Sequence, residues 1–210
     1  MVSVGERGQV YDWSSTQPSQ SHAYVRPALD ALLSSRTWPA RSRVLDFGCG
    51  NGGTAHWLTD RGFDVVGLDV SETGIAVAMK AFPGSKFSTD LSAENVKRLG
   101  PFDLALCIEV IAHCHEPARE LAKIFDALKP GGTLILATPY YGYLKILLLA
   151  LADRLKERQS LSAYATYVSL FTPDTIGRLL REVGFEDVQI AHIGRIPTLA
   201  KDMIVNARKP

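Results

Sequence analysis

The chain has 210 residues, of which 46% are hydrophobic and 21% charged, and its formal net charge at pH 7 is +1. These values are ordinary for one soluble domain with a substantial core, and the balanced charge gives no sign of a nucleic-acid-binding surface. The three cysteines suggest no disulfide framework and fit a reducing cytosol. With no secretory signal pattern at its start, the sequence predicts a cytoplasmic protein.

The first 21 residues form a polar arm that contains two large aromatic residues, Tyr11 and Trp13. A polar terminus is often frayed. Aromatic residues in such an arm also indicate packing on the rest of the protein, and we hypothesise that the arm folds over cofactor and substrate as a lid. Residues 22–35 carry apolar side chains at helical spacing and predict a helix.

Residues 44–53 read Val-Leu-Asp-Phe-Gly-Cys-Gly-Asn-Gly-Gly and are the most informative stretch. A short apolar run ends in an acid, glycines follow, and residues 54–61 look helical, which predicts a strand, a tight loop and a helix. Gly48 and Gly50 can take backbone angles closed to other residues and allow a ligand to lie against the main chain. The helix points free N–H groups at that ligand.

Two kinds of ligand fit this loop. Gly48, Gly50 and Gly53 satisfy the G-x-G-x-x-G pattern of dinucleotide-binding proteins. Asp46, two residues before the first glycine, would repel a pyrophosphate and favours a ligand that brings a cation, such as the ammonium group of an amino acid. An ordinary glycine-rich turn is the third interpretation.

The stretch resembles motif I of class I S-adenosylmethionine-dependent methyltransferases. In that family the acid at the end of the strand and the glycines hold the methionine part of the cofactor. The resemblance starts at Tyr11, for which it implies a cofactor contact. The loop residues to which it assigns cofactor binding are Asp46, Gly48, Cys49, Gly50 and Gly52.

Residues 64–69 predict a second strand that ends in Asp69, about 20 residues after Gly50. At that spacing an acid binds ribose hydroxyls in nucleotide-binding βαβ units, and the resemblance implies the same role for Asp69, with Val70 beside it. Asp69 could instead cap the predicted helix 71–82, and it fits a dinucleotide-binding protein equally well.

Residues 85–90 predict a short third strand that ends in Asp90. The resemblance implies that Asp90 accepts a hydrogen bond from the adenine amino group and that Leu91 packs on the ring. The alternative role for Asp90 is an N-cap of the predicted helix 92–99, and the two roles are compatible.

Residues 102–108 are an apolar run typical of a parallel strand covered on both faces. The segment 102–117, Phe-Asp-Leu-Ala-Leu-Cys-Ile-Glu-Val-Ile-Ala-His-Cys-His-Glu-Pro, resembles the fourth-strand region of small-molecule methyltransferases of the ubiquinone-biosynthesis O-methyltransferase type. The resemblance implies that Cys107 and Ile108 line the cofactor and that Glu109 and His113 lie at the catalytic end.

His113 has three interpretations. A histidine suits a general base because it is largely neutral at pH 7, and it can equally be a structural residue that bonds a backbone carbonyl. His113, Cys114, His115 and Glu109 offer metal-ligand types, but their spacing matches no common structural zinc pattern. We therefore predict no metal site.

Residues 139–171 predict an insertion that covers the substrate. Residues 144–154 are mostly apolar but too few to span a bilayer; they predict a helix that roofs an apolar pocket or lies on a membrane or a partner subunit. The resemblance implies that insertions here set substrate choice. The predicted substrate-binding residues are Trp13, His22, His113, Tyr140, Tyr141, Tyr143, Tyr164 and Tyr167.

Residues 172–183 predict a helix, and residues 185–193 and 199–208 predict two closing strands. The resemblance implies an α/β, Rossmann-like class I methyltransferase fold: seven strands in the order 3-2-1-4-5-7-6, strand 7 antiparallel, with helices on both faces. We expect one domain over residues 1–210, comprising a lid and helix (1–35), a cofactor-binding core (36–138), a substrate cover (139–171) and a closing helix and hairpin (172–210).

The resemblance implies methyl transfer from S-adenosyl-L-methionine, with S-adenosyl-L-homocysteine as product, to an oxygen or nitrogen of a small apolar or aromatic acceptor. We predict no nucleic-acid partner and no transmembrane segment; peripheral membrane contact and the oligomeric state stay open. The alternatives are a nicotinamide-dependent oxidoreductase and a non-catalytic S-adenosylmethionine-binding subunit.

Overall fold

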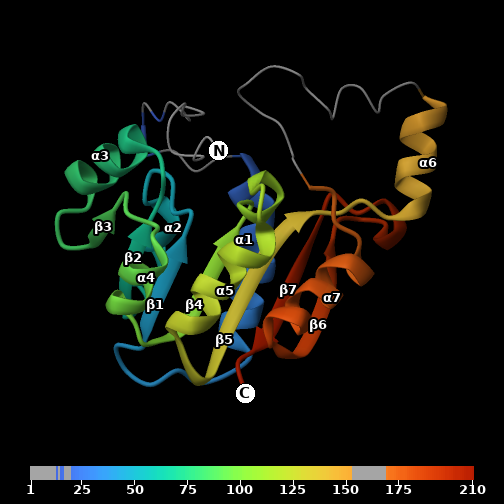
Figure 1. The fold of residues 1–210 in the computed structure, drawn as a ribbon. Coiled ribbons are helices and arrows are strands. Elements are labelled where there is room, and N and C mark those ends of the chain that lie inside the picture. Colours follow the sequence, from blue (N-terminus) through green and yellow to red (C-terminus); the bar gives the residue numbers. More distant parts are fainter. Residues whose placement is uncertain (1–12, 14, 17–19, 153–168) are drawn as a thin grey trace, which may run out of the picture.

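The computed structural model of the protein describes residues 13, 15, 16, 20–152 and 169–210. Within them, a twisted sheet of seven strands is covered by helices on both faces (Figure 1). The strands are β1 (Arg43–Phe47), β2 (Asp64–Leu68), β3 (Lys86–Ser88), β4 (Phe102–Ile108), β5 (Leu128–Pro139), β6 (Glu186–Ile193) and β7 (Asp202–Arg208). The α-helices are α1 (Gln20–Ser34), α2 (Gly53–Thr59), α3 (Glu72–Ala81), α4 (Ala93–Leu99), α5 (Pro117–Ala127), α6 (Tyr143–Leu151) and α7 (Pro173–Val183).

The strand order is β3-β2-β1-β4-β5-β7-β6, which confirms the predicted order. Strand β1 lies between β2 and β4 and runs parallel to both, with Val44 opposite Val65 and Leu104. Strand β7 runs antiparallel to both β5 and β6, as predicted. The chain leaves β1 toward β2 and leaves β4 toward β5, so the sheet changes direction between β1 and β4, where α/β sheets bind ligands.

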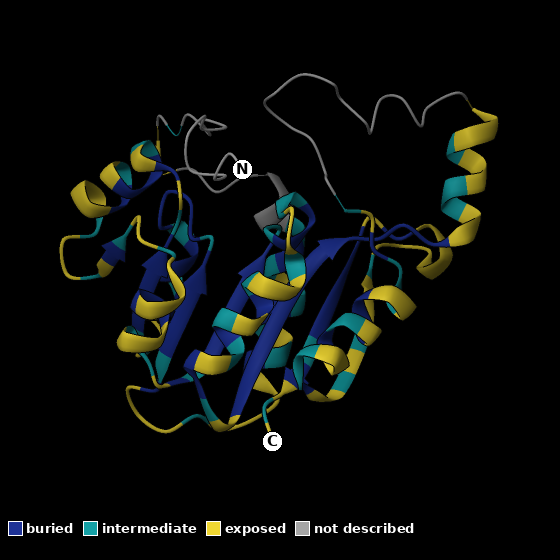
Figure 2. Ribbon diagram, viewed as in Figure 1, coloured by how far each residue is buried: buried dark blue, intermediate teal, exposed yellow. Residues whose placement is uncertain are grey.

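Two apolar layers enclose the sheet because its central strands are apolar on both faces. On one face Val25 and Leu29 of α1 pack with residues of α2 and α3, and on the other Leu121 of α5 and Leu180 of α7 pack with Val96 of α4. Figure 2 shows the buried strands between helices whose outer faces are exposed. The carboxyl ends of β1, β2 and β4 therefore meet at one edge of a rigid scaffold.

One strand boundary differs from the sequence prediction, and one sequence typical of a turn lies inside a strand. The last strand begins at Asp202 and not at residue 199, because Pro197 opens a 3-10 turn, η2 (Pro197–Leu199), and proline cannot donate a ladder hydrogen bond. The Pro-Gly-Gly sequence at residues 130–132, which is typical of a turn, is incorporated in β5, where Gly131 has a φ of 77° and the pairing with β4 shifts register after Phe102.

Helix α6 projects from the body beside the end of β5 (Figure 1). None of its residues is buried, and Leu151 is 75% exposed. Lys145 holds the first turn of helix α6 to the body of the protein. Its Nζ atom donates to the carbonyl oxygens of Tyr140 at 2.7 Å and of Ala200 at 2.8 Å. No helix in the described part of the chain is long and apolar enough to cross a membrane.

We predict opposite outcomes for two leucine truncations. Leu121→Ala should lower the free energy of unfolding by about 2–5 kcal/mol, because Leu121 is fully buried between α5 and the sheet. The control Leu148→Ala, on the exposed surface of α6, should change it by less than about 0.5 kcal/mol. Urea unfolding measures both, and a large loss from Leu148→Ala would contradict the exposed position of α6.

Candidate cofactor and active site

The glycine loop after β1 adopts a conformation that requires glycine. Gly48, Gly50 and Gly52 have φ values of 82°, 54° and 79°, a region that L side chains rarely adopt. The loop also leaves no room for a side chain at Gly52, since an added Cβ would lie 2.7 Å from the Cβ of Ala78. The loop is held to the end of β2 because the backbone N–H of Gly48 donates to the Leu68 carbonyl at 2.7 Å.

Asp46 lies in β1 beneath this loop and is 2% exposed. Its Oδ2 atom is buried without a hydrogen-bond partner among the described residues. Burial, and after it the negative charge of Asp69, raises the pKa of the Asp46 carboxyl to about 7, against a backbone hydrogen bond from Ala55. The site thus holds a buried carboxyl group that lacks a cationic partner within the described chain.

Asp69 follows β2 and is tied to the glycine loop. The backbone N–H of Gly50 donates to its Oδ2 and that of Ser71 to its Oδ1, both at 2.8 Å. Burial raises the pKa of Asp69, and these two hydrogen bonds oppose the rise. The N-cap of α3 is Ser71, whose Oγ accepts from the Gly74 N–H at 3.1 Å, so helix capping is not the role of Asp69. Val70 is 69% exposed beside it.

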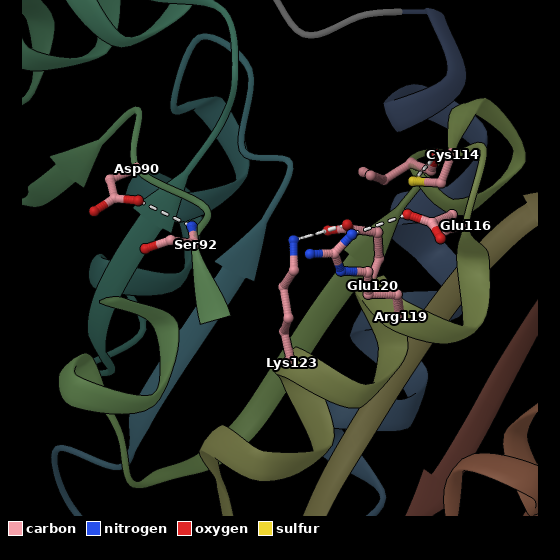
Figure 3. A network of polar contacts seen from close by, with 8 residues as sticks. Asp90, Ser92, Cys114, Glu116, Arg119, Glu120 and Lys123 are labelled. Atoms are coloured by element: carbon pink, nitrogen blue, oxygen red, sulfur yellow. Dashed lines mark hydrogen bonds and ion pairs between the residues drawn. The ribbon is translucent and has the colours of Figure 1, made fainter. Parts of the chain in front are cut away.

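Asp90 follows β3 and is exposed. Its Oδ1 accepts a hydrogen bond from the backbone N–H of Ser92 at 2.9 Å (Figure 3), and hydrogen bonding to Ser92 lowers its pKa. Ser92 caps α4 through Asn95, so Asp90 is not the cap. Leu91 is half-buried against the core, which leaves the Asp90 carboxylate at the surface of the sheet edge.

The cysteines near the site are buried or half-buried thiols. Cys107 is fully buried on the α5 face of β4, whereas its neighbour Ile108 belongs to the α1 face. Burial, followed by the charge of Glu120, raises the pKa of Cys114 to about 11, while Lys123, whose Nζ lies 2.7 Å from Glu120 (Figure 3), opposes the rise. The pKa values of Cys107 and Cys49 are raised by burial as well, so these groups are neutral thiols at pH 7.

Glu109 follows β4 in an unusual backbone conformation, with a φ of 60°. Its N–H donates to the Ala137 carbonyl of β5 at 2.9 Å, and its Oε1 is buried with no hydrogen-bond partner in the described chain. Burial, and after it the charge of Asp202, raises the pKa of Glu109 to about 8, while Lys201 lowers it. A second carboxyl without a full set of partners therefore lies at this edge.

His113 ends a 3-10 turn, η1 (Ile111–His113), after Glu109. The side chain of His113 is half-buried, whereas His115 is exposed. Among the residues that the structure describes, no group of three or more His, Cys, Asp or Glu side chains is placed to hold a metal ion.

The predicted acceptor-side tyrosines separate into two groups. Tyr140 and Tyr141 are 8% and 2% exposed at the end of β5, where the Tyr141 N–H donates to the Phe171 carbonyl at 3.1 Å. Tyr143, by contrast, is 82% exposed on α6 and is not part of this buried pair of tyrosines. Three predicted residues, Tyr11, Tyr164 and Tyr167, lie outside the described residues, as does the side chain of His22.

Trp13 lies on the glycine loop and not on the acceptor side for which it was predicted. A Cβ added at Gly50 would lie 2.7 Å from its ring, and one added at Gly74 would lie 2.9 Å from it. Asn51 holds the same segment, since its Nδ2 donates to the Ser15 carbonyl at 2.8 Å. Two glycines thus make the space for one aromatic ring, a pairing that sequence spacing does not reveal.

Comparison with known proteins gives consistent matches. A family model described as a methyltransferase domain matches residues 20–190. A ubiquinone biosynthesis O-methyltransferase of Aromatoleum aromaticum is 26% identical over 92% of this chain and 87% of that protein, and one of Thiobacillus denitrificans is 30% identical over 79% and 74%. An S-adenosylmethionine-dependent methyltransferase of Mesorhizobium loti has a TM-score of 0.68 at 23% identity, over 89% of this chain and 98% of that chain.

The chain belongs to the methyltransferase family. It is a class I S-adenosylmethionine-dependent methyltransferase, as the motif at the glycine loop predicted, and an enzyme. Its cofactor is S-adenosylmethionine. The buried Oδ2 of Asp46, which has no hydrogen-bond partner among the described residues, fits a ligand with a cationic group.

The sequence analysis of this methyltransferase missed Asp202. It is the first residue of β7, 2% exposed, opposite Pro139 of β5 and Ile193 of β6. A single acidic residue directly before the apolar run Met-Ile-Val could have marked Asp202 as the start of a buried strand. The expected strand start at residue 199 instead placed Asp202 inside the strand.

Two small hollows lie at the opposite edge of the sheet, where the parallel strands begin. One of about 150 Å³ is lined by Arg41 and Asp64, and one of about 180 Å³ by Asp103 and Lys129. Both are smaller than the roughly 300 Å³ at which small-molecule sites begin. They are also remote from the carboxyl ends of the strands, where α/β folds bind ligands.

We predict that Gly52→Ala destabilises the methyltransferase more than Gly62→Ala. Both positions have a positive φ, so both variants carry backbone strain of about 1 kcal/mol. Only the Gly52 variant adds contacts at 2.7 Å to Ala78 and 3.0 Å to Phe87, whereas nothing lies within 4 Å of a Cβ at Gly62. Thermal unfolding should show an additional loss of about 1–3 kcal/mol for Gly52→Ala; equal losses would contradict the described packing of the loop.

Proposed function

We propose that this methyltransferase transfers the methyl group of S-adenosylmethionine to an oxygen or nitrogen atom of a small apolar or aromatic acceptor. The observation that carries the proposal is the buried Asp46 carboxyl beneath the glycine loop, with its Oδ2 unpartnered in the described chain. A buried carboxylate is costly unless a cation or hydrogen-bond donors compensate for its lost hydration. The ammonium group of the cofactor's methionine part supplies both.

Three carboxylates at this edge match three parts of the cofactor. Asp46 takes the ammonium group. Asp69 takes the ribose hydroxyls, because each of its oxygens accepts one backbone N–H and keeps a second lone pair. Asp90 takes the adenine amino group through its exposed carboxylate, which accepts a hydrogen bond from Ser92 on one oxygen. This set disfavours a pyrophosphate ligand, which Asp46 and Asp69 would repel.

S-adenosylmethionine, when bound, supplies a methyl group that the sulfonium charge already activates. The residues of the protein then hold the acceptor in line with that methyl group and exclude water, which can provide much of the rate enhancement. We assign the acceptor's proton to Glu109 or His113, both of which follow β4. An acceptor hydroxyl benefits from such a base, whereas a neutral amine attacks without one.

The apolar or aromatic character of the acceptor is supported by what surrounds Glu109. Ile108 precedes it at the end of β4, and Tyr140 and Tyr141 follow the neighbouring strand β5. Aromatic rings beside an acceptor site would favour a flat apolar ligand, since such rings offer a large contact area at little cost in side-chain entropy. Helix α6 adds further exposed leucines beyond them.

The affinity for S-adenosylhomocysteine should depend on pH through Asp46. The pKa of Asp46 is about 7 in the free protein, and only the ionised carboxylate pairs with the ligand's ammonium group. Affinity should therefore rise from pH 6 to pH 8, falling up to about tenfold for each pH unit below the pKa, with a proton released on binding. Isothermal titration calorimetry in two buffers of different ionisation enthalpy measures both effects.

Asp46→Asn is the matched variant, because it keeps the shape of the side chain and removes its charge. It should bind S-adenosylhomocysteine more weakly, without the pH slope, and NADH should bind to neither protein. A pH-independent affinity in the unmodified protein would contradict the role of Asp46. Binding of NADH alone would contradict the proposed cofactor.

Methyl transfer itself is tested with a panel of phenols and amines, by following S-adenosylhomocysteine formation by mass spectrometry. With an accepted phenol, His113→Ala should lower turnover by about 10²–10⁴-fold if His113 is the base, and leave S-adenosylhomocysteine affinity nearly unchanged. The control is His115→Ala, at the exposed neighbouring histidine. Equal turnover in both variants would exclude His113 as the base, and cofactor binding without any turnover would favour a non-catalytic subunit.

A further inference from the structure

Three residues of the N-terminal arm, Trp13, Ser15 and Thr16, lie on the loop that follows β1. Trp13 is half-buried, and the other two are exposed. The Nδ2 atom of Asn51 donates to the Ser15 carbonyl at 2.8 Å, across a separation of 36 residues in the sequence. A Cβ added at Gly53 would lie 3.7 Å from the Thr16 carbonyl oxygen, which places this oxygen near the start of α2. The arm therefore meets the loop at more than one point.

The indole ring of Trp13 bridges two segments of the site. Its six-membered ring faces Gly50, where an added Cβ would lie 2.7 Å from the Cζ2 atom of the ring. Its five-membered ring faces Gly74 in the first turn of α3, where an added Cβ would lie 2.9 Å from the Cδ1 atom. Both glycines are buried. The ring therefore joins the loop after β1 to the helix after β2, and only glycine at both positions leaves room for it.

Gly50 is also part of the cofactor site. Its backbone N–H donates to Oδ2 of Asp69 at 2.8 Å, and its φ is 54°. Its carbonyl oxygen would lie 2.8 Å from a Cβ at Gly74, so the loop is closely packed against α3 at the same point. One residue thus contacts both the ring of the arm and the carboxylate at the end of β2. The positions of Trp13 and Asp69 are linked through Gly50.

A loop of this composition is costly to fix in one conformation. Residues 48–53 read Gly-Cys-Gly-Asn-Gly-Gly, and glycine loses more backbone entropy on ordering than any other residue. A ring packed against the loop restricts it before a ligand arrives, so that less ordering accompanies ligand binding. Docking of Trp13 and binding of a ligand to the loop should therefore favour each other.

We propose that Trp13 is a positioning residue for S-adenosylmethionine, which packs between Gly50 and Gly74, holds the glycine loop in its cofactor-binding conformation and so couples the N-terminal arm to cofactor binding. Trp13 acts on the cofactor through Gly50. By thermodynamic reciprocity, the factor by which the docked ring strengthens cofactor binding equals the factor by which bound cofactor strengthens docking. This inference rests on the proposed function, in which the glycine loop and Asp69 hold the cofactor.

The first measurement is the affinity for S-adenosylhomocysteine, by isothermal titration calorimetry. Trp13→Ala should weaken binding by about 5–150-fold, the usual range for such couplings. Trp13→Phe keeps an aromatic ring and should give an intermediate affinity. The matched control is Trp38→Phe, which changes a tryptophan beside the hollow at the opposite edge of the sheet and should bind like the unmodified protein.

The second measurement is the rate at which chymotrypsin cleaves after Trp13, with and without saturating S-adenosylhomocysteine, with products identified by mass spectrometry. Chymotrypsin takes an aromatic ring into its own pocket. Cleavage therefore requires that Trp13 leave the two glycines, and its rate follows the population of the undocked arm. Bound S-adenosylhomocysteine should slow this cleavage by the same factor as Trp13→Ala weakens binding. Cleavage after Tyr143, which is 82% exposed on α6, is the internal control and should not slow.

A role for Trp13 in folding alone predicts a different pattern. Trp13→Ala would then lower the melting temperature of the free protein, while S-adenosylhomocysteine affinity well below that temperature stayed the same and bound ligand left cleavage after Trp13 unchanged. That result would overturn the coupling. Tighter binding by Trp13→Ala would also overturn it, because the ring would then occupy the place of the cofactor. Failure of the unmodified protein to bind S-adenosylhomocysteine would instead count against the proposed function, so the two failures are distinguishable.

Discussion

The site depends on one buried charge, the Asp46 carboxyl beneath the glycine loop. Its strand, β1, lies at the centre of the sheet, and neither water nor a described side chain reaches its Oδ2. The cost of that burial is the reason that the pKa of Asp46 is raised to about 7. Binding a cationic ligand removes this cost. On the proposed role of Asp46, cofactor affinity and the protonation of Asp46 are therefore two aspects of one interaction.

The groups that the fold places around Asp46 determine which cationic ligand fits the site. The sheet changes direction between β1 and β4, the glycines allow the loop its positive φ angles, and Asp69 links the loop to β2 through the Gly50 N–H. After β4, the Oε1 atom of Glu109 is also buried without a hydrogen-bond partner among the described residues.

The strand order and the glycine loop could be predicted from sequence because the signals are local: apolar runs, an acid at a strand end, glycines and a proline at a helix start. Asp202 and Trp13 could not, because their roles arise from contacts between distant segments. Asp202 reaches the end of β5 only because β7 inserts antiparallel between β5 and β6, and Trp13 meets Gly50 and Gly74 only through folding of the arm. The start of β7 was misplaced because Pro197 begins a 3-10 turn that periodicity does not show.

The most direct test of this account is a crystal structure of the complex with S-adenosylhomocysteine at pH 8, where Asp46 is ionised. The account predicts that the ligand's ammonium nitrogen lies within hydrogen-bonding distance of Asp46 Oδ2 and that its ribose hydroxyls lie on Asp69. A complex in which the ammonium group binds elsewhere and Asp46 Oδ2 has no partner would contradict it.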